Sequence, residues 1–137
     1  MPSHEFDLAP PPDTERSREL WLQQAVGFVL FEDVRRYAMN QIPDGCEPHV
    51  REAAERGIDA AVYGLMMVID GVSGSLSNDR QRVELQIIAR HVCLNEDDED
   101  EVLASLDLAS GDGMCTGYHR WLNGDFGADA VAFPAGR

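Results

Sequence analysis

The break Pro43-Asp44-Gly45 separates two long segments whose apolar residues recur at helical spacing, and this pattern constrains the fold more than any other feature. In the first segment, steps of three and four connect apolar side chains from Leu20 to Ala38, as in a helix that buries one face. Asp13 or Thr14 can cap its first turn. The pattern predicts a helix from about Thr14 to Ile42, in which Gly27 marks either a close crossing or a break into two helices.

The second segment predicts a helix from Pro48 to Ile69, because proline suits a first helical turn and Asp70-Gly71 follows the last apolar residue. A connection this short makes the two helices antiparallel neighbours. We expect the core to contain the apolar end of the second helix and the aromatic side chains of the first: Leu65, Met66, Val68, Ile69, Trp21, Phe28, Phe31 and Tyr37.

The pattern changes after Asp70. Residues 71–79 are rich in Gly, Ser and Asn and predict a loop. Within 82–94, Val83, Leu85 and Ile87 alternate with polar residues as on a half-buried strand, which we favour, with a bulge or tight turn near Ala89. A helix over the same residues, with Leu85, Ile88 and Val92 inward, is the alternative.

Short helices are expected at Val102–Leu108 and at Tyr118–Leu122. The predicted fold is α+β, mainly α, with two long antiparallel helices, a short β-hairpin or strand element, and one or two short C-terminal helices. One globular domain is expected over residues 14–126, between an extended or disordered arm at 1–13 and a frayed tail at 127–137.

The charge balance limits the partners. The chain has 25 Asp and Glu against 11 basic residues, all of them Arg, and its formal net charge is −14. This field repels nucleic acid and anionic membranes and speeds association with basic proteins. No apolar run approaches the roughly 20 residues of a membrane span. The odd number of cysteines predicts reduced thiols and a cytoplasmic location.

Six consecutive carboxylates form the densest acidic run: Glu96, Asp97, Asp98, Glu99, Asp100 and Glu101. They can favour the start of the helix expected next, and they are either a solvated face or a docking surface for a basic partner. Calcium is not expected, because the sixth position counted from Asp97 or Asp98 is Val102 or Leu103 instead of glycine. We take the run as the candidate partner-binding site.

Catalytic and metal-binding signals are weak. Three Cys–His pairs lack the spacing of a known zinc module: His91 with Cys93, Cys115 with His119, and Cys46 with His49. Asp70 either acts as an acid of raised pKa or simply ends its helix. We therefore expect no metal, no cofactor and no catalytic residue, and an enzyme that uses Asp70, Glu84 and a histidine is the second alternative.

Three short motifs occur in order along about half the chain. Residues 63–72 read YGLMMVIDGV, a polar loop precedes VELQI at 83–87, and LNED at 94–97 precedes a short segment expected to be helical. This order resembles a group of small acidic bacterial proteins with an apolar helix ending in Asp-Gly-Val, a β-hairpin and an acidic Asn-Asp turn. Some of these are immunity proteins that sit beside secreted toxins. The resemblance implies a helix-plus-hairpin fold and transfers no site residues.

These observations predict a non-enzymatic binding protein. We expect an immunity or antitoxin-type inhibitor, monomeric or homodimeric, that neutralises a basic partner protein such as a toxin through its acidic surface. A small acidic adaptor or secretion chaperone is the alternative, and it requires an exposed apolar groove.

Overall fold

The computed structural model describes residues 2–96 and 99–135, and within them the chain has an α+β fold. Helices cover 47% of the chain. The α-helices are α1 (Glu15–Leu30), α2 (Arg36–Asn40), α3 (Pro48–Ile69) and α4 (Met114–Trp121). The strands are β1 (Phe6–Leu8), β2 (Ser75–Ser77), β3 (Arg82–Glu84), β4 (Ile88–Cys93), β5 (Glu101–Asp107) and β6 (Ala132–Pro134). They form three two-stranded antiparallel sheets, so the expected mainly α fold with a single hairpin is wrong.

The first predicted helix is divided. Thr14 caps α1 with its side-chain oxygen, and α1 ends at Leu30. A π-helical turn, Phe31–Arg35, then leads into α2, which ends at Asn40. The expected continuous helix to Ile42 is therefore wrong, and with it the description of the fold as two long helices with one hairpin.

The π-turn has a packing reason. A π-turn accommodates one residue more than an α-turn, which changes the faces of the residues around it. Phe31 is buried and meets the ring of Tyr118 edge-on, with centroids 5.6 Å apart. Arg35, at the end of the turn, reaches Asp59 of α3 through a 2.7 Å Nε–Oδ1 ion pair.

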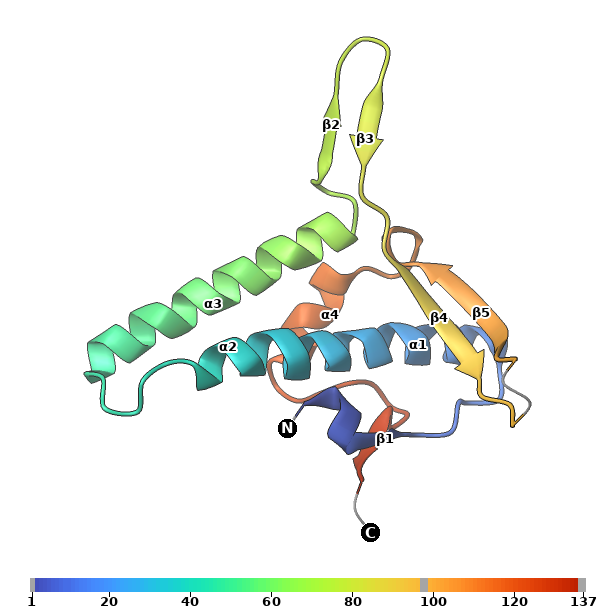
Figure 1. Ribbon diagram of the computed structural model, residues 1–137, viewed down its shortest axis with the longest axis horizontal. Helices are drawn as coiled ribbons and strands as arrows, with labels where there is room; N and C mark the ends of the chain where they lie inside the picture. Colours follow the sequence, from blue (N-terminus) through green and yellow to red (C-terminus); the bar gives the residue numbers. More distant parts are fainter. Residues whose placement is uncertain (1, 97–98, 136–137) are drawn as a thin grey trace.

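Helix α3 runs back across the first helical segment in the opposite general direction (Figure 1). It begins at Pro48 and its last residue is Ile69. Met66 and Ile69 are buried as predicted, whereas Leu65 and Val68 are only half-buried. The apolar end of α3 therefore lies at the core with one side still accessible.

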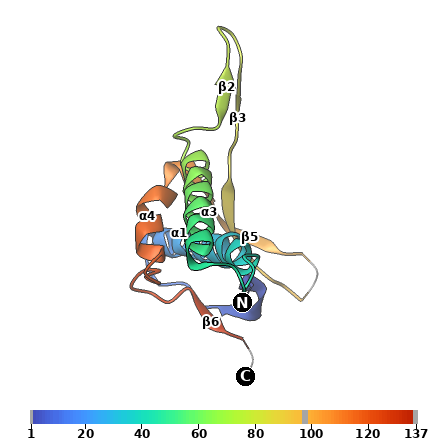
Figure 2. The same cartoon turned by 90° about the vertical axis from the view of Figure 1, so that its left-hand side faces the viewer.

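The region after α3 forms two separate hairpins. The β2–β3 hairpin projects from the helical body (Figures 1 and 2), where a loop was expected over residues 71–79. Strand β4 then pairs with β5, and the irregularity in their register lies between His91 and Val92 instead of near Ala89. Residues 82–94 thus contain strands, as favoured, and the helix alternative is wrong.

The helix predicted at Val102–Leu108 is wrong, because most of this segment is strand β5. Spacing within the segment suits a helix, but hydrogen bonding to β4 outweighs that local preference. Helix α4 begins at Met114, earlier than the predicted Tyr118, and ends at Trp121.

The two chain ends come together as a sheet. Strand β1 pairs with β6 from Phe6–Pro134 to Leu8–Ala132, so segments expected as an arm and a tail lie side by side. Ala9 and Val131 beside this pair are both buried.

The core lies where α1, α3 and α4 meet. Its larger members include Trp21, Leu22, Phe31, Val62, Met66, Ile69, Leu108, Met114, Tyr118 and Trp121. Of the aromatic side chains predicted to be there, Phe28 packs against the cluster from a half-buried position. Tyr37 is 63% exposed, so its predicted place in the core is wrong; it lies on short α2, beyond the main packing area. No helix among the described residues is both long and apolar enough to cross a membrane.

Candidate functional site

Asp70 caps helix α4 from across the fold. Its Oδ1 accepts a hydrogen bond from the Met114 N–H at 2.5 Å, and its Oδ2 accepts one from the Cys115 N–H at 2.9 Å. These are among the backbone donors that a helix leaves unpaired at its N-terminus, and a carboxylate there is favoured. Gly113, just before the helix, has φ +100° beside the carboxylate, a conformation that suits glycine. The geometry gives Asp70 a structural role.

The thiol of Cys115 lies between Asp70 and Tyr63. Burial raises the pKa of Cys115, and the hydrogen bond to Asp70 and the charge of that carboxylate raise it further. The contact with Cys115 is in turn the largest cause that raises the pKa of the Tyr63 phenol. Because a thiolate is the reactive form of cysteine, this environment favours an unreactive thiol.

The Cys–His pairs lie in three different places. His91 and Cys93 are on β4, Cys115 and His119 are on α4, and Cys46 and His49 flank the start of α3. His91 packs against Trp21 with ring centroids 5.2 Å apart, and His119 lies 5.9 Å from the ring of Tyr63. Among residues 2–96 and 99–135, no three His, Cys, Asp or Glu side chains form a group that could hold a metal ion.

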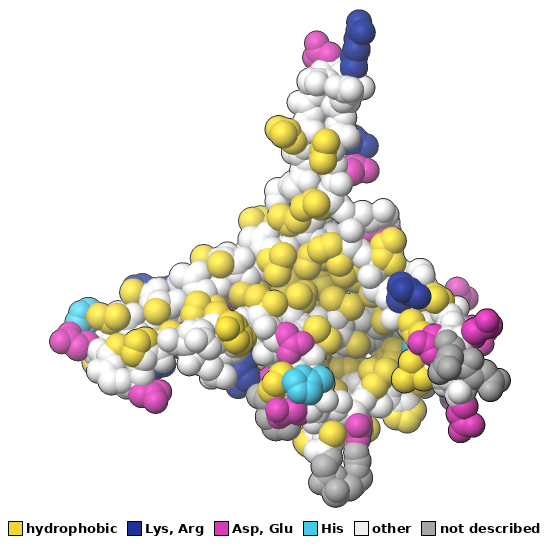
Figure 3. All heavy atoms as spheres, in the orientation of Figure 1, with side chains coloured by type: hydrophobic (Ala, Val, Ile, Leu, Met, Phe, Trp, Pro, Cys, Tyr) yellow, Lys and Arg dark blue, Asp and Glu magenta, His cyan; other side chains and the backbone are white. Residues whose placement is uncertain are grey.

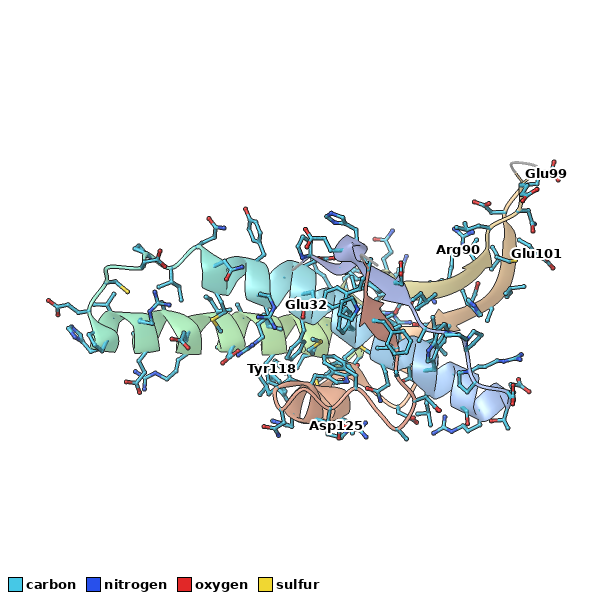
Figure 4. The ribbon with its side chains drawn as sticks, turned by 90° about the horizontal axis from the view of Figure 1, so that it is seen from below. Glu32, Arg90, Glu99, Glu101, Tyr118 and Asp125 are labelled. Carbon is cyan, nitrogen blue, oxygen red and sulfur yellow. The ribbon has the colours of Figure 1, made fainter. Side chains whose placement is uncertain are left out.

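Of the acidic run, Glu96, Glu99 and Asp100 lie between β4 and β5, and Glu101 is the first residue of β5. Figure 4 shows Glu99 and Glu101 at the far end of this hairpin, away from the helical body, with Arg90 farther back along β4. The Asn95 side chain donates to the Glu99 carbonyl at 2.9 Å, across the turn. Asp97 and Asp98 lie outside the described residues.

The described residues of the acidic run form no salt bridge with a described basic side chain. Glu96, Glu99, Asp100 and Glu101 are all exposed, and no described basic side chain forms a salt bridge with any of them. Apolar side chains are exposed on the same hairpin: Leu94 is 80% exposed and Leu103 52%. The hairpin therefore combines unpaired negative charge with apolar surface.

A groove lies beside this hairpin. It has a volume of ≈ 770 Å³ and runs between the start of α1 and the β4–β5 pair. Leu22, Leu103 and Leu106 supply apolar lining, and Glu15, Arg18 and Glu19 supply charge. Its size is in the range of ligand pockets, and its mixed lining suits a peptide segment better than a small apolar molecule.

Sequence reasoning missed two features. The sequence predicts a loop where β2 lies and a strand where β3 lies, and no local pattern indicates that the two pair as a hairpin. The contact between Cys115 and Tyr63 joins two helices distant in sequence, and no local pattern predicts it.

Comparison with known protein families, with curated proteins and with solved structures finds no match for this chain. The arguments about its function therefore rest on its own residues.

Proposed function

We propose that this chain is a non-enzymatic binding protein of the immunity or inhibitor type, which docks on a basic surface of a partner protein through the β4–β5 hairpin. The observation that carries the proposal is the projecting position of Glu99 and Glu101 at the end of that hairpin. A projecting acidic turn can enter a cationic groove, such as the nucleic-acid site of a nuclease, and occupy it in place of phosphates.

The composition of the hairpin supports docking over simple solvation. Leu94 lies two residues before the acidic run, and Leu103 lies two residues after it on β5. An interface commonly has a desolvated apolar centre within a charged rim, whereas a purely solubilising turn needs no exposed leucine. Neutralising the unpaired carboxylates with a basic partner would also remove their mutual repulsion.

The whole-chain charge supports the same kind of partner. At −14, the protein attracts basic proteins from a distance and speeds their encounter with it. The three cysteines are all free thiols, which is consistent with our proposal that the protein acts in the cytoplasm.

The groups that an enzyme would use have other roles in the fold. Asp70 caps α4, and Glu84 forms a 3.1 Å ion pair with Arg82 on the β2–β3 hairpin. The raised pKa of Cys115 opposes a role as nucleophile. These facts favour a binding role over the enzyme alternative.

The test uses the partner captured from native cell lysate. The variant Glu99→Gln/Asp100→Asn/Glu101→Gln should associate with that partner more slowly than the native chain, because it lacks part of the attractive field. Raising the salt concentration should bring the native rate down toward that of the variant, since exposed charges are screened beyond about 8–10 Å at physiological ionic strength.

A matched control removes three exposed carboxylates elsewhere, in the variant Asp44→Asn/Glu52→Gln/Asp129→Asn. It has the same net charge as the hairpin variant. If both variants associate at the same rate, the hairpin has no special place in binding and the proposal fails.

An adaptor or secretion chaperone is a second candidate, and the groove beside α1 favours it. Such a protein would bind an apolar segment of a secreted protein, with Leu22 and Leu106 as contacts. Its binding would depend weakly on salt and would be reduced by Leu106→Gln, whereas the hairpin variant would leave it unchanged.

A further inference from the structure

The β2–β3 hairpin has an apolar face that no other described part of the chain covers. Leu76 and Val83 are cross-strand partners, so their side chains lie on the same face. They are 78% and 70% exposed, and Leu85, just after β3, is 64% exposed. Every residue from 71 to 88 is exposed. Figure 3 shows hydrophobic side chains along the hairpin and over the face of the body at its base.

The opposite face of the hairpin is polar. The pairs Ser75–Glu84 and Ser77–Arg82 alternate with the apolar pair, so their side chains point the other way. Arg82 and Glu84 form an ion pair along this face, with Nε and Oε2 3.1 Å apart. The hairpin is thus built like a strand pair that buries one face, yet its apolar face is open. A two-stranded hairpin alone in water is marginally stable, so packing of another surface on its apolar face would stabilise it.

The charge of this hairpin differs from that of the rest of the chain. Residues 71–88 contain two acidic side chains, Asp79 and Glu84, and two basic ones, Arg80 and Arg82. Their sum is zero, so the whole formal charge of −14 lies outside the hairpin. The negative surfaces outside the hairpin repel a second copy of the chain, whereas the hairpin, with zero net charge, does not. A strongly basic partner would be drawn to other surfaces.

We propose that the apolar face of the β2–β3 hairpin packs against the same face of a second copy, forming a homodimer with its two-fold axis between the hairpins. A two-fold interface needs one self-complementary patch, and the Leu76–Val83 pair provides it. Two such ribbons stack about 10 Å apart, as sheets do. Val72, Ile87 and Ile88, at the base of the hairpin, are further exposed apolar residues that such an interface can bury.

The test is the oligomeric state of the purified full chain, by sedimentation equilibrium from about 1 to 100 μM, the range in which Kd values of typical weak dimers fall. The native chain should be dimeric. The variant Leu76→Gln/Val83→Thr should raise the dimer Kd at least about tenfold, because each copy loses two buried apolar contacts. Both positions are exposed in the single chain, so an unchanged circular dichroism spectrum and urea midpoint should show that the variant still folds.

The control is Leu94→Gln, which removes an equally exposed leucine from the β4–β5 hairpin and should leave the dimer Kd unchanged. A native chain that stays monomeric up to about 100 μM overturns the proposal. An unchanged dimer Kd in Leu76→Gln/Val83→Thr also overturns the proposal. An equal rise of the dimer Kd in Leu94→Gln does the same.

Salt separates this inference from the proposed function. Screening reduces the repulsion between two copies that each carry −14, so raising salt should strengthen the dimer. The same change should slow association with a basic partner. A dimer that weakens as salt rises contradicts packing through a hairpin of zero net charge. This holds whatever the outcome of the partner test.

Discussion

Trp121 on α4 donates its indole N–H to Oε1 of Gln24 on α1, which is 97 positions earlier in the chain, at 2.5 Å. Both side chains are buried. The indole ring also meets Phe31 and Phe126, so this polar contact lies in an aromatic part of the core. The bond fixes the position of α4 against α1 and satisfies a donor that water cannot reach.

Replacing Gln24 with Leu should destabilise the protein by about 1–3 kcal/mol, because the Trp121 N–H would be left buried without an acceptor. Urea denaturation measures the change. In a double-mutant cycle, Trp121→Phe should cost less in the Gln24→Leu background than in the native one. Strictly additive free energies of unfolding would show that the two side chains do not depend on each other.

Gly27 is the site of a close crossing, one of the two roles considered for it from the sequence. A Cβ at this position would lie 2.5 Å from ring atoms of Trp121. Gly27→Ala should therefore destabilise the protein by about 1–3 kcal/mol through overpacking. Gly64 on α3 has nothing within 4 Å of its Cβ position. Gly64→Ala should stabilise by about 0.4–1 kcal/mol, and thermal unfolding that ranks the two variants the other way would contradict this packing.

Asp70 should matter for stability through the start of α4. Asp70→Ala leaves the N–H groups of Met114 and Cys115 without their acceptor and should cost about 1–2 kcal/mol, as the loss of a cap does. Asp70→Asn keeps one acceptor oxygen and should cost less. Hydrogen exchange at these two amides measures the local effect, and equal protection in native and Asp70→Ala protein would argue against the cap.

Cys115 should be the slowest of the three thiols to react with iodoacetamide at pH 8. Burial and the Asp70 carboxylate raise its pKa, so less thiolate is present than on an ordinary cysteine. All three thiols are half-buried, which makes Cys46 and Cys93 fair comparisons. Mass spectrometry after timed labelling gives the rates. A Cys115 that reacts first would contradict its raised pKa.

Asp33 should make stability depend on acid. Hydrogen bonds from Ser3, through its hydroxyl and its N–H, lower the pKa of Asp33. A carboxylate whose pKa is lower in the folded state stabilises the fold above its unfolded pKa of about 3.9. That stabilisation is lost as the pH falls through the pKa of the folded state. The stability difference between native protein and Asp33→Asn should therefore shrink below about pH 4. Urea midpoints across the pH range measure it, with Asp44→Asn as an exposed control.

The sequence predicted best those elements whose own apolar residues recur at helical or strand spacing. The apolar end of α3 and the alternation in Val83 and Leu85 are of this kind. The failure at 102–108 has a physical cause: Val102 and Leu106 are spaced as in a helix, while their pairing with β4 depends on residues elsewhere. The π-turn at Phe31 likewise follows from contacts with α4 and α3 that no local spacing contains.

The candidate sites also depend on contacts between segments distant in sequence, which local spacing does not contain. The acidic run is visible in the sequence, but its position at the end of a hairpin required β5 to be recognised as a strand. The role of Asp70 depends on Met114, 44 positions later, so the sequence could offer only the choice between an acid and a helix end. The apolar face of β2–β3 required the register that places Leu76 opposite Val83.

The sheet of β1 and β6 cannot form during synthesis until β6 has been made. Phe6 is synthesised 128 residues before its strand partner Pro134. At about 5–20 residues per second, β1 exists for about 6 to 26 seconds before β6 is made. During that interval the Phe6 ring has only contacts such as the one with Phe28, 4.9 Å away between ring centroids, to hold it. A nascent chain stalled before residue 132 should accordingly leave β1 accessible to protease, and a chain that contains β6 should protect it.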